Sequence, residues 1–232
     1  MGETIYSIPI NETFDAKCGC PLCALHSQQE KSSLEYILGP AMMEPDIRLE
    51  TNRLGFCGRH GNMLLAMKNR LPLALTLQTR LRAVRELLAA PGEGGRALFG
   101  KKSAQEDPLF SCADDCFICR RISAFDERII SNTVYLWQSD TDFREKFRQQ
   151  QFFCLGHASS LLRCASVTFS KQKYVDFRAD VTELCLRYAD ALDASLTGFI
   201  DSFDHKNASV PLPDKQRRCA EDAIAFLSPE DE

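Results

Sequence analysis

One pattern of cysteine and histidine occurs twice in this 232-residue sequence. A Cys-x2-Cys pair is followed by a Phe-Cys-x2-His motif, whose Phe stands 33 or 34 residues after the pair. The second copy of the pair comes 96 residues after the first, and the second Cys-x2-His comes 97 residues after the first. The motif residues are Cys20, Cys23, Cys57 and His60 in the first copy, and Cys116, Cys119, Cys154 and His157 in the second. This duplication predicts two copies of one structural unit.

Each copy contains the ligands of a metal site. Two ligands separated by two residues lie on one turn of the chain, so both can reach a single ion. Three thiolates and one imidazole form a Cys3His set, which is typical of structural Zn²⁺. We therefore predict two Zn²⁺ ions per chain, with one ion bound within each copy: Cys20, Cys23, Cys57 and His60 bind the first, and Cys116, Cys119, Cys154 and His157 bind the second.

Several alternatives to two zinc ions remain open. The motif residues can instead be small buried residues and core histidines, although this interpretation must explain the same coincidence twice. Cys20 and Cys23 can form a redox pair, but no apolar strand precedes them as a thioredoxin-like fold requires. Cys18 and Cys112 lie near the pairs and can replace a ligand or remain free. Iron can take the place of zinc in such sites.

The composition of the chain narrows the kinds of partner that it can bind and the cellular compartments in which we expect it. Lys and Arg number 28 against 32 Asp and Glu, and this net charge of −4 disfavours nucleic acid as a partner. No apolar run approaches the roughly 18–20 residues of a membrane span. Residues Met1–Asn11 lack the basic and apolar pattern of a signal peptide. We therefore expect a cytoplasmic protein, in which the eleven cysteines serve as metal ligands or thiols rather than disulfides.

The spacing of apolar residues predicts an all-α fold. Between the ligand pairs, Ser27 is positioned to begin a helix that Gly39-Pro40 ends, and Pro45 is positioned to begin the next. In the second copy, Phe143 and Phe147 lie four residues apart on one helical face. Two longer apolar stripes are expected to lie in the core: Leu77, Leu81, Val84 and Leu88, and then Phe177, Val181, Leu184, Tyr188, Leu192, Leu196, Phe199 and Phe203.

The copies define the expected domains. Residues 1–90 form the first zinc-binding helical repeat, and residues 116–232 form the second with additional C-terminal helices. Residues 91–115, which are rich in Gly and contain Pro, are expected to be the linker. Ala220–Leu227 is expected to form a short docking helix near the end.

The motifs resemble those of a bacterial family of unknown function. The resemblance rests on both ligand sets, with Cys18-Gly19-Cys20 before the first and Asp115 before the second, and on the Met43-Glu44-Pro45-Asp46 segment. It covers most of the chain and implies no activity. Some members are described as substrate-binding proteins of ABC transporters, a role that requires export. We do not expect that role here, because no signal peptide is recognised.

The Met-Glu-Pro-Asp segment is a candidate recognition site beside the first metal. Its polar residues are Glu44, Asp46, Arg48, Glu50 and Asn52. The simpler interpretation is a solvated helix face with acids in its first turn. The leading function is a zinc-stabilised binding or scaffold protein without catalysis, whose protein or small-molecule partner and oligomeric state the sequence does not identify.

An enzyme or a redox switch is the alternative function. An open zinc site can use Glu44 or Glu50 as a base, and the thiols can cycle with disulfides. His26 and His205 have no motif around them and are expected at the surface.

Overall fold

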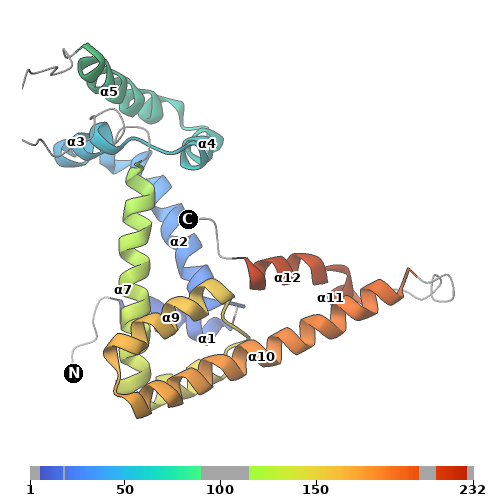
Figure 1. Cartoon of the computed structure of the whole chain (residues 1–232). Helices are drawn as coiled ribbons and strands as arrows, with labels where there is room; N and C mark the ends of the chain where they lie inside the picture. Colours follow the sequence, from blue (N-terminus) through green and yellow to red (C-terminus); the bar gives the residue numbers. More distant parts are fainter. Residues whose placement is uncertain (1–5, 18, 90–114, 204–212, 229–232) are drawn as a thin grey trace, which may run out of the picture. The chain divides into compact units, whose positions relative to one another are not determined.

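The computed structural model describes residues 6–17, 19–89, 115–203 and 213–228, and this part of the chain is helical with no strand (Figure 1). The all-α prediction is therefore confirmed. Packing contacts divide the chain into two compact units. The first unit joins Met1–Ser27 to Phe125–Glu232, and the second is Gln28–Ala124.

These units do not follow the copies in the sequence. The expected boundary was a linker at residues 91–115, of which only Asp115 is described. Helix α2 (Pro21–Ile37) instead begins in the first unit and ends in the second, and helix α7 (Phe117–Ser139) begins in the second and ends in the first. Each unit therefore contains residues from both copies of the motif.

The first unit is a helical assembly around an aromatic core. In addition to its parts of α2 and α7, it contains α1 (Ser7–Ala16), α8 (Thr141–Arg148), α9 (Leu155–Thr168), α10 (Lys171–Asp201), α11 (Asp214–Arg217) and α12 (Cys219–Leu227). The last of these matches the expected C-terminal helix. Five phenylalanines of the core have no exposed surface: Phe14, Phe143, Phe147, Phe153 and Phe177.

Short aromatic distances tie this core to the motif. The ring centroids of Phe147 and Phe153 lie 4.8 Å apart, and Phe153 directly precedes the motif residue Cys154. Asp140 begins α8, because its side chain accepts hydrogen bonds from the backbone N–H groups of Asp142 and Phe143. The expected helix with Phe143 and Phe147 on one buried face is thus confirmed.

The second unit has a smaller aliphatic core. It contains the 3₁₀ helix η1 (Pro40–Met43), α3 (Pro45–Leu54), α4 (Gly58–Ala66) and α5 (Arg70–Ala89). Its buried apolar residues are Leu34, Ile37, Leu38, Ala41, Leu54, Leu64, Leu73, Cys116, Phe117, Ile118 and Ile122. Pro45 occupies the first turn of α3 as expected, since proline there gives up no helical hydrogen bond.

Two helical expectations need correction. Helix α2 begins at Pro21 rather than near Ser27, because Pro21 already fits a first helical turn. The first apolar stripe is also not core. Leu81 is 68% exposed and Leu88 is 65% exposed on α5, whose buried residues are Pro72, Leu73 and Thr76. The periodicity correctly identified one face of the helix as apolar. The buried residues of the helix, however, lie on a different face.

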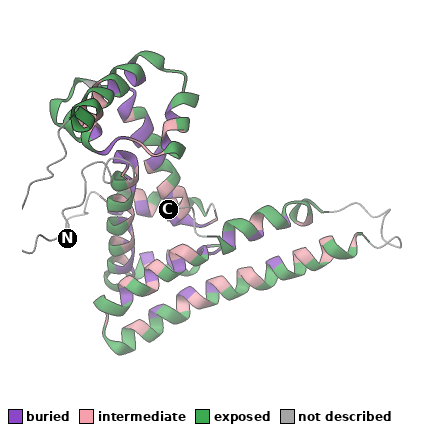
Figure 2. Ribbon diagram, turned by 45° about the horizontal axis from the view of Figure 1, so that its top comes forward, coloured by how far each residue is buried: buried purple, intermediate pink, exposed green. Residues whose placement is uncertain are grey.

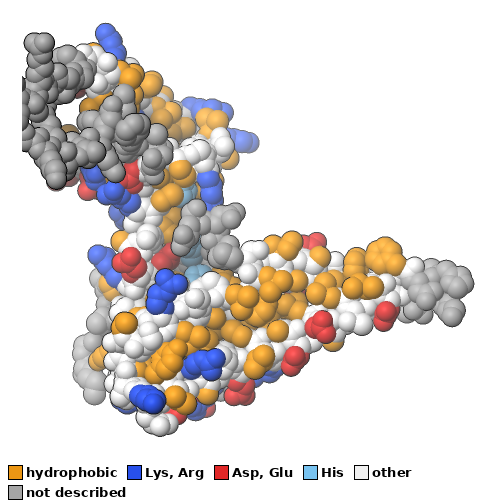
Figure 3. All heavy atoms as spheres, viewed as in Figure 1, with side chains coloured by type: hydrophobic (Ala, Val, Ile, Leu, Met, Phe, Trp, Pro, Cys, Tyr) orange, Lys and Arg blue, Asp and Glu red, His pale blue; other side chains and the backbone are white. Residues whose placement is uncertain are grey.

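The second stripe is buried over part of its length. Buried and exposed residues alternate along α10 (Figure 2), and its buried members are Phe177, Val181, Leu184 and Leu192. Beyond that point Leu196 and Phe199 are partly buried, and Phe203 is 76% exposed. Apolar side chains also gather on the surface of α10 and α12 (Figure 3). Leu186 of α10 and Ile224 of α12 are each 63% exposed. None of the described helices combines the length and apolar character needed to cross a membrane.

Candidate metal centres

The eight motif residues form two clusters, but each cluster takes half of its ligands from each copy. The first centre is Cys20, Cys23, Cys154 and His157, and the second centre is Cys57, His60, Cys116 and Cys119. Within each centre the four ligand atoms all lie within 4.8 Å of one another. The predicted pairing within each copy is therefore wrong, whereas the eight residues themselves do come together in groups of four.

The length of the helices explains why the copies exchange ligands. Helix α2 begins just after Cys20 and has 17 residues, and α7 begins just after Cys116 and has 23. At 1.5 Å per residue, such helices carry the chain about 25 and 35 Å away from the cysteines at their starts. The Cys-x2-His that follows in sequence then belongs to the other unit, where it joins the other pair of cysteines.

Each centre forms where two helices begin. Cys20, Cys57, Cys116 and Cys154 each directly precede a helix, respectively α2, α4, α7 and α9. Their carbonyl oxygens accept the first helical hydrogen bonds, at 3.2, 2.9, 3.0 and 2.8 Å from the nitrogens of Ala24, Gly61, Arg120 and Ala158. The free N–H groups and the positive end of a helix dipole favour thiolate there. The second ligand of each motif lies three residues on, within the same first turn.

The first centre has the spacing of a tetrahedral site. The Nδ1 atom of His157 lies 3.1 Å from the sulfur of Cys154, 3.3 Å from that of Cys23 and 3.7 Å from that of Cys20. The sulfurs of Cys23 and Cys154 are 3.6 Å apart. Bonds of about 2.0–2.3 Å to a tetrahedral zinc would keep ligand atoms about 3.3–3.8 Å apart. The donor set and its spacing therefore fit Zn²⁺.

The second centre repeats this geometry. The Nδ1 atom of His60 lies 3.2 Å from the sulfurs of both Cys57 and Cys119, and 3.5 Å from that of Cys116. The sulfurs of Cys57 and Cys119 are 3.8 Å apart. Both centres thus present three sulfurs to the same nitrogen of a histidine.

The close packing of these groups changes their proton affinity. Burial disfavours a charge on His157, but hydrogen bonds to Cys154 and Cys20 outweigh it and raise its pKa to about 10. Burial and the neighbouring sulfur of Cys116 raise the pKa of Cys119 to about 12. Hydrogen bonds from Cys20 and Cys23 lower the pKa of Cys154, and the same cluster raises that of Cys23. In the metal-free protein, the thiols and the imidazole of a centre hold protons between them. A divalent ion that binds there would displace these protons.

Residues outside the motifs hold the helix starts together. The carbonyl oxygen of Gly55 accepts a hydrogen bond from the N–H of Phe117 at 3.0 Å, which links the chain before Cys57 to the start of α7. Gly55 has φ of 69°, in the left-handed region that glycine adopts without strain. A role of Gly55 in the site was not predicted, although its position two residues before the ligand Cys57 was a signal in the sequence.

The second centre has a carboxylate behind its histidine. The Nε2 atom of His60 lies 3.0 Å from Oε1 of Glu30, and that oxygen is also 2.8 Å from the guanidinium of Arg59. Glu30 is only 8% exposed. The burial of Glu30 had no signal in the sequence, because Glu30 stands in the polar run Gln28-Gln29-Glu30-Lys31.

The candidate recognition residues do not join either ligand cluster. Glu44, Asp46, Arg48 and Glu50 are exposed, and Asn52 is partly buried. Glu44 accepts a hydrogen bond from the hydroxyl of Tyr36 at 2.7 Å, which raises the pKa of that tyrosine. This placement agrees with a solvated face of α3, and a recognition role stays a prediction.

The remaining cysteines and histidines have separate positions. Cys164, Cys185 and Cys219 belong to neither cluster and form no disulfide. Cys18, Cys112 and His205 lie outside the described residues. The expected surface position of His26 is wrong, since its side chain is 16% exposed and its Nδ1 pairs with Asp126 at 2.8 Å.

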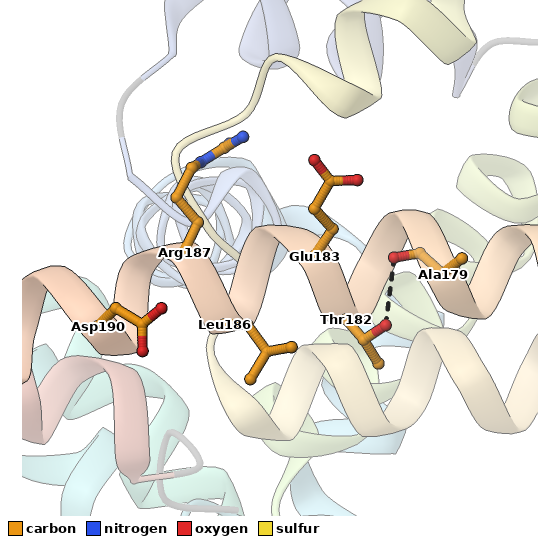
Figure 4. A pocket seen from close by; sticks show the side chains of 6 residues that line it. All are labelled: Ala179, Thr182, Glu183, Leu186, Arg187 and Asp190. Carbon is orange, nitrogen blue, oxygen red and sulfur yellow. Dashed lines mark hydrogen bonds between the residues drawn. The ribbon is translucent and has the colours of Figure 1, made fainter.

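A surface hollow on α10 is a weaker candidate site. It has a volume of about 620 Å³ and is lined by Ala179, Thr182, Glu183, Leu186, Arg187 and Asp190 (Figure 4). All of these residues lie on α10, and Figure 4 shows their side chains projecting in several directions from it. One helix cannot enclose a ligand, so this hollow is open surface.

Comparison with known proteins gives a family but no activity. No curated protein and no solved structure matches the chain. A family model described as a family of unknown function, DUF6062, matches residues 1–228. That match spans both metal centres and nearly the whole chain, so the protein belongs to the DUF6062 family.

Proposed function

We propose that this chain is a zinc-stabilised binding or scaffold protein with two structural Zn²⁺ ions and no catalysis. The observation that carries the proposal is the complete ligand set of each centre. Three sulfurs and one imidazole nitrogen surround one point and fill the four positions that a structural zinc uses. A catalytic zinc has three protein ligands and keeps a position for water or substrate.

The position of the centres supports a structural role. Each one joins the beginnings of two helices that are distant in the sequence, and each lies beside the core of its own unit. Structural zinc contributes an apparent 10–16 kcal/mol or so in small peptides. That is comparable to the roughly 5–15 kcal/mol that keeps a whole domain folded. Binding of zinc is therefore coupled to folding of each unit.

The free thiols support a reducing compartment, and we place the protein in the cytoplasm. Among the described cysteines none forms a disulfide, and six of them are metal ligands in this proposal. Thiolates remain available to zinc where disulfides are kept reduced.

Metal analysis tests the proposal directly. Protein purified without chelator is expected to contain two zinc ions per chain, and Cys57→Ser or Cys154→Ser is expected to lose one of them. Cys164→Ser is the matched control, because Cys164 is partly buried but belongs to neither centre. A zinc content near zero, or iron in its place, would overturn the proposal.

Removal of zinc separates the structural role from the enzyme alternative. We expect a chelator to abolish helical circular dichroism over much of the chain, because the helix starts lose their common anchor. A catalytic zinc would leave the melting profile nearly unchanged while an activity disappeared. Rapid alkylation of Cys20 or Cys23 in zinc-loaded protein would instead support a thiol switch.

A further inference from the structure

The two centres differ in what contacts the outer nitrogen of their histidine. In the second centre, Nε2 of His60 is hydrogen bonded to the buried carboxylate of Glu30 at 3.0 Å. In the first centre, His157 presents Nδ1 to the three sulfurs in the same way. Among the residues that the structure describes, however, none forms a hydrogen bond with Nε2 of His157.

The duplication itself provides an acid at the matching position. Glu30 stands seven residues after Cys23, and Asp126 stands seven residues after Cys119. The side chain of Asp126 is one methylene shorter than glutamate, and its Oδ2 pairs with Nδ1 of His26 at 2.8 Å. Asp126, the acid of the second copy, is therefore hydrogen bonded to His26 and not to the metal-site histidine His157.

The residues around Glu30 also differ from those around Asp126. The position that corresponds to His26 is occupied by Ile122, which is 4% exposed and offers no hydrogen bond. Arg59, which contacts Glu30 at 2.8 Å, corresponds to Gly156 in the second copy. Within the described part of the chain, the first centre therefore has no counterpart of the Glu30 and Arg59 pair that lies beside His60.

Such an outer carboxylate affects how firmly a histidine holds a metal. By accepting the N–H of one ring nitrogen, it fixes the tautomer in which the other nitrogen is free to bind, and it makes that nitrogen more basic. Loss of the partner typically costs 10–100-fold in metal affinity. Burial does not compensate here, because each centre has two buried and two partly buried ligands.

We propose that the two centres are unequal zinc sites, in which the second centre retains its ion and the first centre exchanges it. Glu30 is the positioning residue that produces the difference. The inference rests on the proposed function in one respect, namely that both centres bind Zn²⁺. It adds that the first centre is the place where zinc enters or leaves the chain while the second centre stays loaded.

The order of zinc loss tests this inference. Protein loaded with two zinc ions is mixed with excess chelator, and the species are followed by native mass spectrometry. We expect the first ion to leave 10–100-fold faster than the second. Alkylation of the one-zinc species, followed by peptide mapping, is expected to label Cys20, Cys23 and Cys154 and to spare Cys57, Cys116 and Cys119.

Glu30→Gln tests the cause of the difference. The amide keeps the size of the side chain but removes its charge, so zinc loss from the second centre is expected to accelerate about tenfold or more. The rate at the first centre serves as the internal reference, because a general loss of stability would accelerate both. Asp126→Asn is the matched control, and we expect it to leave the second-centre rate unchanged.

The outcomes distinguish this inference from the proposed function. Equal rates of loss, faster loss from the second centre, or an unchanged second-centre rate in Glu30→Gln would overturn the inference while leaving two structural zinc ions. A starting content below two zinc ions would overturn the proposed function itself. If Glu30→Gln does not fold, the order of alkylation in the unchanged protein still decides the case.

Discussion

The sulfur of Cys23 lies 3.3 Å from Nδ1 of His157, although 134 residues separate them in the sequence. In the second centre, the sulfur of Cys119 lies 3.2 Å from Nδ1 of His60, 59 residues away. Each centre therefore joins one copy of the motif to the other. The copies are related in sequence, but neither contains a complete metal site.

Double variants distinguish this exchanged pairing from pairing within a copy. Cys20→Ser with Cys154→Ser removes two ligands of one centre, so we expect the protein to retain one zinc ion. Cys20→Ser with Cys57→Ser removes one ligand from each centre and is expected to reduce the content toward zero. The measurement is zinc per chain after gel filtration.

Pairing within a copy would reverse these two results. In that case Cys20→Ser with Cys57→Ser would keep one ion, and Cys20→Ser with Cys154→Ser would lose both. Cys164→Ser with Cys219→Ser controls for the loss of two thiols, since neither residue belongs to a centre.

Fragments provide a second test of the exchange. Residues 1–90 contain only two ligands of each centre, and residues 116–232 contain the other two. We expect each fragment alone to bind zinc weakly and to show little stable helix, because half a ligand set does not close a tetrahedron. Mixed in equal amounts with zinc, they are expected to form a one-to-one complex with two ions.

Calorimetric titration and gel filtration of the fragments measure this outcome. A fragment that binds one zinc tightly and folds alone would contradict the exchanged centres. It would instead favour the division into two independent repeats.

The sequence predicted which residues gather but not how they pair. The regular spacing of the motifs and the apolar periodicity were enough for an all-α fold and for two groups of four ligands. Pairing depended on the path of α2 and α7, each of which begins in one unit and ends in the other, so that each Cys-x2-Cys and the Cys-x2-His that follows it belong to different units. A local spacing rule contains no information about that path.

The two apolar stripes show the same limit for packing. Phe177 and Leu81 both belong to helical runs of apolar residues, yet Phe177 is fully buried and Leu81 is 68% exposed. Periodicity identifies an apolar face, but burial requires another element to cover it. The core of the first unit supplies such cover to α10, while the packed face of α5 is formed by Pro72, Leu73 and Thr76.

Core substitutions are expected to follow the observed burial. Phe147 has no exposed surface, and its ring centroid lies 4.8 Å from that of Phe153, which precedes a ligand of the first centre. Phe147→Ala is therefore expected to lower the free energy of unfolding by about 3–5 kcal/mol. Leu81→Ser removes an exposed apolar side chain and is expected to change it by about 0.5 kcal/mol or less.

Urea denaturation of zinc-loaded protein measures both effects. Zinc content serves as the control, because the comparison requires both variants to retain two ions. A large loss of stability in Leu81→Ser would show that the exposed stripe of α5 is covered in solution.

Zinc affinity is expected to rise with pH because the ligands must lose protons. In the metal-free arrangement the pKa of His157 is raised from an ordinary 6.5 to about 10, and that of Cys119 is raised to about 12. Both groups therefore hold a proton at pH 7, and zinc has to displace it. The raised pKa of His157 stabilises the metal-free fold fully below about 6.5, and this contribution is lost as the pH rises through about 10.

The difference between metal-free and zinc-loaded stability should accordingly widen between pH 6 and pH 9. Chelator competition across that range measures the affinity, and each displaced proton is expected to add about one factor of ten per pH unit. Calorimetry in two buffers with different protonation enthalpies gives the number of protons released at pH 7, which we expect to be above zero at each centre. An affinity independent of pH would mean that the ligands are already deprotonated in the metal-free protein, contrary to the raised pKa values of His157 and Cys119.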